Sequence, residues 1–232
     1  MAEGSSAAMP MAGAARYDGF ADWYDAFNAP HVQANRDLIA QLMGPGDGLC
    51  LDLGCGTGLY FDTVRATGRT PIGVDFSADQ LRLARGRGVC LQADAATLPF
   101  ADQVFPAVQL MWISTDVNDF TAVVREAARV LQPGGVMVFC GVHPCFMGPH
   151  IEYREDGGRI LHPTYRLADW HEEKPWWTGG AGLRNRVGMR HVPLADLLHA
   201  FLDAGLTIEK VVEPEPGLAL PAALALRLVK AG

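Results

Sequence analysis

Residues Cys50 to Tyr60 read CLDLGCGTGLY, a short apolar run that breaks into three glycines and then continues with helix-compatible residues. The run predicts a buried strand, and Gly54, Gly56 and Gly58 allow a sharp turn that approaches a ligand without obstruction by a Cβ atom. A turn from a strand into a helix N-terminus gathers unpaired N–H groups around one small volume. This stretch therefore predicts an α/β unit with a ligand-binding turn.

Asp52 distinguishes this turn from a dinucleotide-binding turn. An acid two residues before the first glycine repels a pyrophosphate but accepts hydrogen bonds from an ammonium group. The spacing Gly54-x-Gly56-x-Gly58 also differs from the dinucleotide fingerprint G-x-G-x-x-G. An amino-acid-like ligand, which carries both an ammonium and a carboxylate, fits this turn better.

The motif D-L-G-C-G-T-G at residues 52–58 resembles the first motif of class I S-adenosylmethionine-dependent methyltransferases. Three later segments resemble the same family in the expected order: Pro71–Val74 before Asp75, then Ala93-Asp94-Ala95 with Leu98-Pro99-Phe100, then Gln132-Pro133-Gly134-Gly135 before an apolar run. The resemblance implies S-adenosylmethionine as the cofactor. It also implies a doubly wound, seven-stranded, mostly parallel Rossmann-like sheet with an antiparallel last strand inserted between its neighbours.

The resemblance further implies which residues hold the cofactor. Asp75 is expected to grip the ribose hydroxyls and Asp94 to meet the adenine amino group, while Phe76 either stacks on adenine or packs in the core. Tyr24 lies in an expected helix, Arg16–Phe27, that closes over the cofactor or simply packs on the core. The expected cofactor-binding residues are Tyr24, Asp52, Gly54, Cys55, Gly56, Gly58, Asp75, Phe76, Asp94, Ala95, Leu110 and Met111.

The acceptor is expected beyond the fourth and fifth strands, because ligands lie outside the carboxyl ends of parallel strands. Asp116, after the fourth strand, either acts in catalysis or caps the helix at 120–131. His143, after the fifth strand, suits a general base because imidazole titrates near neutrality, although a turn hydrogen bond is the alternative. The expected substrate contacts are Trp112, Thr115, Tyr153, Tyr165, Trp170, Trp176 and Trp177.

One position departs from the family pattern. Relatives usually have an acid after the phenylalanine that begins the fourth strand, and this chain has Phe105-Pro106. Proline removes one N–H at the start of the strand, where the loss is tolerated.

Residues 145–182 lose the regular alternation and are rich in glycine, proline, histidine and aromatic residues, with no clean helix or strand period. A connector needs only a few residues. We expect residues 145–190 to form a lid over the acceptor, or alternatively a dimer contact. The histidines lack metal-ligand spacing, so no metal is expected. Residues 1–15 are expected to form a disordered tail and residues 16–232 one methyltransferase domain.

Composition limits the partners. The net charge of −7 comes without a basic stripe, which argues against nucleic acid. The five cysteines form no C-x-x-C pair, and the chain shows neither a signal peptide nor an uninterrupted apolar run long enough to span a membrane. These features predict a cytoplasmic monomer or homodimer with no membrane partner.

The sequence thus predicts methyl transfer from S-adenosylmethionine to a small organic acceptor, such as a phenol or a polyketide-like intermediate of secondary metabolism. Alignment of the acceptor, which can contribute ~7–11 kcal/mol, is expected to matter more than a base. The methylated atom, oxygen, nitrogen or carbon, stays open. Three alternatives also stay open: a protein on this fold that catalyses a cyclisation or only binds the cofactor, a nicotinamide-dependent oxidoreductase, and methylation of a protein or RNA.

Overall fold

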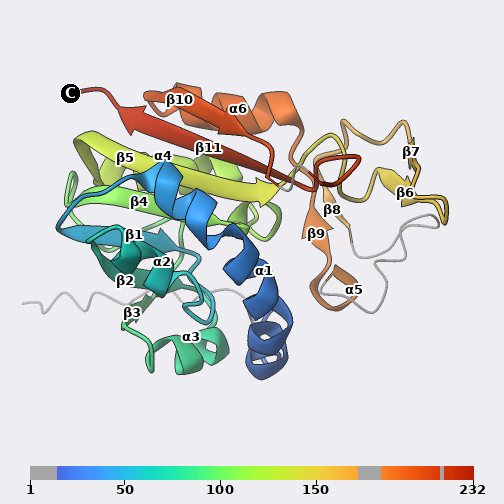
Figure 1. Ribbon diagram of the computed structural model, residues 1–232. Coiled ribbons are helices and arrows are strands. Elements are labelled where there is room, and N and C mark those ends of the chain that lie inside the picture. The colour runs from blue at the N-terminus through green and yellow to red at the C-terminus, as the bar shows by residue number, and fades with distance from the viewer. Residues whose placement is uncertain (1–14, 172–183, 215–216) are drawn as a thin grey trace, which may run out of the picture.

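The computed structural model describes residues 15–171, 184–214 and 217–232 of the chain (Figure 1). The expected tail at 1–15, apart from its last residue, and the expected substrate contacts Trp176 and Trp177 lie outside the described residues.

One seven-stranded sheet organises the molecule, in the order β10-β11-β5-β4-β1-β2-β3. The central strands are parallel, whereas β11 pairs antiparallel with both β5 and β10. This confirms the predicted doubly wound sheet with an inserted antiparallel last strand. The strands are β1 (Leu49–Leu53), β2 (Thr70–Asp75), β3 (Val89–Gln92), β4 (Phe105–Met111), β5 (Leu131–Val142), β10 (Leu206–Val212) and β11 (Ala223–Lys230).

Helices cover both faces of the sheet (Figure 1). In β1, Leu51 and Leu53 join the buried cluster shared with one helical layer, whereas Cys50 joins the cluster on the other face. Burial on both faces explains why the central strands are almost continuously apolar. One layer contains α1 (Ala21–Met43), α2 (Phe61–Ala66) and α3 (Ala78–Ala84), and the other contains α4 (Phe120–Val130) and α6 (Leu194–Asp203).

The N-terminal helix differs from the prediction. A helix at 16–27 was expected, but α1 begins at Ala21 and continues through Pro30 to Met43, and residues 16–19 form a turn before it. A proline inside a helix removes one backbone hydrogen bond. The buried side chains of Val32, Ile39 and Leu42 hold the helix against the sheet on the far side of Pro30, so packing overrides the local break.

The start of β4 accommodates Pro106 as expected. The pairing of β4 with β5 shifts register between Phe105 and Ala107, so the missing N–H falls at an irregularity of the ladder.

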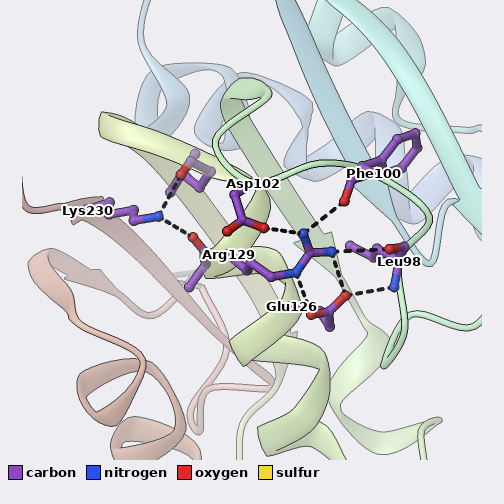
Figure 2. A network of polar contacts seen from close by, with 8 residues as sticks. Leu98, Phe100, Asp102, Glu126, Arg129 and Lys230 are labelled. Carbon is purple, nitrogen blue, oxygen red and sulfur yellow. Dashed lines mark hydrogen bonds and ion pairs between the residues drawn. The ribbon is translucent and has the colours of Figure 1, made fainter.

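The loop before β4 is anchored by a charged network at the end of the sheet opposite the glycine turn (Figure 2). Arg129 of α4 donates to the carbonyls of Leu98 and Phe100 at 3.1 and 2.8 Å and pairs with Glu126 and Asp102. Lys230, at the end of β11, donates to two carbonyls at the C-terminus of α4. The network joins α4, the last strand and the loop whose first residues, Asp94 and Ala95, line the site described below.

The insertion after β5 is more regular than expected. It contains two short hairpins, one of β6 (Ile151–Tyr153) with β7 (Arg159–Leu161) and one of β8 (Trp170–His171) with β9 (Met189–Arg190), together with α5 (Arg184–Val187). The sequence of this segment shows no helix or strand period, although it contains these short elements. Strands of two or three residues are too short to display a period in the sequence.

Candidate active site

Two adjoining cavities open at the carboxyl ends of the central strands. The larger has a volume of 860 Å³ and the smaller 380 Å³. Both fall within the range of about 300–1,000 Å³ that is usual for small-molecule sites. The cavities share five lining residues, which are Tyr24, Asn28, Gly54, Met111 and Trp112. Together they can hold one long ligand, or two ligands that meet at this junction.

The larger cavity collects the residues predicted to hold a nucleoside. Asp75 ends β2, and its carboxylate accepts hydrogen bonds from the backbone N–H groups of Gly56 (2.8 Å) and Ser77 (2.9 Å). Burial raises the pKa of Asp75, against the lowering effect of these bonds. Phe76, Asp94 and Ala95 line the same cavity. The ends of β2 and β3 therefore bring these four residues together, as the order of the motifs predicted.

The glycine turn is shaped for a close backbone approach. Gly54 has a φ of +74°, and a Cβ atom there would lie 2.6 Å from Cδ1 of Ile113. Gly56 and Gly58 also have positive φ. Cys55, within the turn, lines the smaller cavity.

Asp52 is a buried acid beside this turn and lines the smaller cavity near the junction. Asp52 is 1% exposed, and neither of its carboxylate oxygens has a hydrogen-bond partner among the described residues. Burial raises its pKa to about 7. Gln109, its register partner on β4, is close enough to lower that pKa but makes no hydrogen bond of standard geometry with it. A buried acid without a partner is suited to a cationic group supplied by a ligand.

Tyr24 reaches the junction because α1 is fastened to the glycine turn. The next residue, Asp25, accepts hydrogen bonds from Thr57 (2.6 Å) and from both guanidinium ends of Arg87. Hydrogen bonds from Arg87 lower the pKa of Asp25, so the anchor is ionic at neutral pH. Burial, reinforced by Asp116, raises the pKa of Tyr24 and keeps its hydroxyl protonated.

Gln80 is a candidate residue that was not predicted from the sequence. It lies on α3, lines the larger cavity and is 1% exposed, and within the described residues neither of its amide atoms has a hydrogen-bond partner. The available signal was a glutamine at a core-facing position of the helix that Ser77 caps. Ser77 caps α3, since its Oγ accepts the N–H of Gln80 at 3.2 Å.

The smaller cavity lies between α1 and the ends of β4, β5 and β11. Beyond Trp112 its walls are mainly apolar, and the polar side chains there include Tyr60, His31 and Asn35; the other lining residues there include Phe27, Val32, Val142, Met147 and Ala222. Tyr60 and His31 were not predicted as site residues, because the neighbours that make them part of a site lie far away in the chain.

Trp112 stands at the junction in a left-handed backbone conformation, with a φ of +61°. Its indole N–H donates to the Tyr60 hydroxyl at 2.8 Å, and its backbone N–H donates to the Cys140 carbonyl at 2.7 Å. A residue with a Cβ rarely adopts this conformation, which costs on the order of 1–3 kcal/mol and persists only where the surroundings enforce it.

Asp116 lines the larger cavity, whereas its neighbour Thr115, an expected substrate contact, lines neither cavity; distant segments hold both residues. Asp116 accepts hydrogen bonds from Tyr17 (2.7 Å) and Arg184 (2.5 Å), and Thr115 accepts from Arg184 (2.9 Å). The alternative that Asp116 caps α4 was wrong, since Asp119 caps that helix by accepting the N–H of Ala122 at 2.9 Å.

His143 lies outside the lining of both cavities. Its ring accepts the backbone N–H of Cys145 at Nδ1 (3.2 Å), and Nε2 faces Glu213 at 3.1 Å. Both nitrogens therefore have partners in the protein. This arrangement corresponds to the hydrogen-bonding alternative, and the role of general base stays an untested prediction.

Several other expected contacts also lie away from the cavities. Leu110 is fully buried in the core cluster with α4 and α6, on the opposite face of the sheet from α1. Tyr153 is half exposed on β6, and the Tyr165 hydroxyl accepts the Leu194 N–H at 2.8 Å. Trp170 packs under the Arg16 guanidinium, 3.7 Å from the ring centroid. The described part of the insertion thus brings none of its three expected substrate residues to the cavity walls.

Two further observations concern partners. Over the described residues, none of the helices combines the length and apolar character that a membrane crossing requires. Within the same residues, histidine, cysteine and acidic side chains do not gather into groups of three or more that are suited to a metal ion.

Comparison with known proteins agrees with this geometry. Residues 51–139 match the family model described as a methyltransferase domain. A demethylmenaquinone methyltransferase of Mycobacterium marinum is 38% identical over 135 residues, which cover 55% of this chain and 58% of that protein. The chain thus spans about half the length of the curated relatives that it matches.

Solved structures share the fold. An S-adenosylmethionine-dependent methyltransferase from Mesorhizobium loti superposes with a TM-score of 0.67 at 24% identity, covering 85% of this chain and 98% of that one. The [4+2]-cyclase SpnF superposes with a TM-score of 0.57 at 21% identity, covering 84% and 79%. The family resemblance read from residues 52–139 is confirmed.

Proposed function

We propose, on the premise that this chain is a class I S-adenosylmethionine-dependent methyltransferase, that it transfers a methyl group to a small organic acceptor. The observation that carries the proposal is Asp52, a buried carboxyl group beside the glycine turn, for whose oxygens the described part of the chain offers no hydrogen-bond partner. An ammonium group of a ligand would satisfy it. A pyrophosphate, as in a nicotinamide cofactor, would be repelled.

The residues around both cavities fit this cofactor. Asp52 would pair with the amino group, Gly54 would allow the amino-acid chain to pass, and Asp75 would bind the ribose hydroxyls. Asp94 and Phe76, in the larger cavity, would bind the adenine. The cofactor supplies a methyl group already activated on a sulfonium sulfur. The protein's own contribution is therefore mainly to hold the acceptor in line and to exclude water.

The part of the smaller cavity away from Asp52 is the site we assign to the acceptor, since Asp52 itself would hold the amino group of the cofactor. It continues past Trp112 from the junction, and its apolar and aromatic walls favour a flat, largely apolar molecule. The names of the curated relatives, demethylmenaquinone methyltransferases, support an aromatic ring acceptor of this kind. Those matches span about half of each relative, so the acceptor and the methylated atom are part of the proposal.

Binding measurements test the cofactor assignment. We expect S-adenosylhomocysteine to bind the purified protein in isothermal titration calorimetry, while NAD(H) does not. Asp75→Ala should weaken that binding by about tenfold or more, because a buried charged hydrogen-bond group is worth ~1.5–3 kcal/mol. Binding of NAD(H) in place of S-adenosylhomocysteine would overturn the proposal in favour of an oxidoreductase.

A second candidate is a cyclase on the same fold. The likeness of the sheet to the [4+2]-cyclase SpnF supports it, although a match at this identity concerns the fold alone. A panel of phenols and polyketide-like acceptors separates the two candidates. Bound S-adenosylmethionine that gives no methylated product with any acceptor would favour the cyclase, and a methylated product would exclude it as the main activity.

A further inference from the structure

We infer that Tyr60 is the hydrogen-bond donor that orients an oxygen of the acceptor, and that Trp112 is the positioning residue that aims it. This inference rests on the proposed function and names the chemical class of its acceptor: a flat aromatic molecule that presents a ring oxygen. The observation behind it is a tethered hydroxyl on the wall of the smaller cavity.

Tyr60 precedes α2, directly after the glycine turn, and is 7% exposed. Its oxygen accepts the indole N–H of Trp112 at 2.8 Å. Within the described part of the chain, the Tyr60 hydroxyl proton has no hydrogen-bond acceptor of its own, although the side chain lines the cavity. Tyr60 therefore has one donor left for a ligand.

The Tyr60 hydroxyl is also held in its protonated form. Burial raises its pKa, and nearby Cys140, Tyr24 and Asp52 act in the same direction. Tyr60 can thus donate to a phenol, phenolate or ketone oxygen across the working pH range, but it is not placed to remove a proton. Donation to an oxygen on the acceptor ring fixes the ring's rotation within the cavity.

Trp112 fixes the position of this donor. Its left-handed backbone and its bond to the Cys140 carbonyl hold the indole at the junction of the two cavities. Because the indole N–H is used by Tyr60, the ring presents only apolar surface to a ligand. An acceptor ring is therefore bounded by an apolar wall and meets one fixed donor, an arrangement that favours flat acceptors with an oxygen over pure hydrocarbons.

Two probes of the same shape test this inference. 1-Naphthol carries a ring oxygen and naphthalene does not, so the ratio of their dissociation constants isolates the oxygen contact. Equilibrium dialysis against protein saturated with S-adenosylhomocysteine measures both. Tyr60→Phe should weaken 1-naphthol binding about 3- to 10-fold, as expected for one hydrogen bond, and leave naphthalene binding within about twofold.

Trp112→Phe is the second variant, because it removes the indole N–H but keeps an aromatic ring. Like Tyr60→Phe, it should weaken the binding of 1-naphthol more than the binding of naphthalene, since the Tyr60 hydroxyl is then no longer tethered. Thermal unfolding and the affinity for S-adenosylhomocysteine check that each variant keeps its fold and its cofactor site. If Tyr60→Phe perturbs the fold, the ratio of the two dissociation constants measured for Trp112→Phe tests the role of Tyr60 in its place.

The outcomes separate this inference from the proposed function. An unchanged ratio of the two constants in both folded variants overturns the role of Tyr60. Failure of the wild-type protein to bind either probe while it binds S-adenosylhomocysteine overturns the acceptor cavity and leaves the cofactor assignment standing. Failure to bind S-adenosylhomocysteine itself overturns both.

Discussion

The buried acid Asp52 predicts that cofactor affinity depends on pH. Its pKa is about 7 in the ligand-free protein because burial disfavours the charged form. An ammonium group requires the ionised form, so below pH 7 binding must first remove a proton. Each pH unit below 7 then weakens binding about tenfold, or ~1.4 kcal/mol. At pH 5 the affinity for S-adenosylhomocysteine should be about 100-fold lower than at pH 8.

Asp52→Asn is the matched perturbation, because the amide has the same shape but no charge. At pH 8 it should weaken S-adenosylhomocysteine binding about 10- to 100-fold, as expected for a lost hydrogen bond to a charged group. It should also remove most of the pH dependence. Calorimetric titrations at half-unit steps from pH 8 to pH 5 measure both effects, and circular dichroism at each pH checks the fold.

The same substitution should stabilise the ligand-free protein. The folded pKa of Asp52, about 7, lies above its ordinary value of 3.8, so the folded state holds this proton more tightly than the unfolded state. The stability that this proton provides is therefore lost as the pH rises from 3.8 to about 7, and above pH 7 the ionised group destabilises the fold by up to about 4 kcal/mol, for a difference of about three units. Asp52→Asn removes that cost, and urea unfolding at pH 8 should show the gain.

A dissociation constant that stays within threefold from pH 5 to pH 8 would refute this reasoning. So would an Asp52→Asn variant with unchanged affinity at pH 8. The pKa of Asp75 is also raised by burial, and Asp75 lines the larger cavity. Any pH dependence that persists in Asp52→Asn is therefore attributed to Asp75, and the double variant with Asp75→Asn should remove it.

Three further predictions concern the fold around the site. Asp119→Ala removes the cap of α4 and should lower the free energy of unfolding by about 1 kcal/mol in urea, whereas an unchanged midpoint would contradict the cap. His143→Gln should lower the melting temperature, since the ring bridges Glu213 and the Cys145 N–H. The affinity for S-adenosylhomocysteine should not change. A 100-fold loss of turnover in a folded variant would contradict this and support His143 as the general base. His191→Phe should make the free energy of unfolding less sensitive to acid. Burial and the adjacent His150 lower the pKa of His191 to about 4. The stability that this neutral ring provides is therefore complete above pH 6.5 and falls by about 3 kcal/mol as the pH approaches 4. Urea unfolding at pH 7 and pH 4.5 measures the difference, and equal acid losses in wild type and variant would exclude this role.

The sequence by itself determined the sheet and most of the nucleoside half of the candidate site. Asp75 is the last residue of β2, Asp94 lies two residues after the end of β3, and Gly54 follows β1 directly. In a parallel sheet the carboxyl ends of neighbouring strands meet at one edge, so residues found one strand at a time are brought together by the topology. Linear motifs are sufficient for such a site because each motif marks one strand end.

Only the tertiary structure decided the acceptor half. Tyr60 meets Trp112 across 52 positions of the chain, and Tyr17 and Arg184 both reach Asp116 from distant segments. His143, also placed at a strand end, turns to Glu213 and away from the cavities. Spacing along the chain predicts where a strand ends. The direction in which a side chain points, and the partner that occupies it, depend on packing between segments that no local pattern relates.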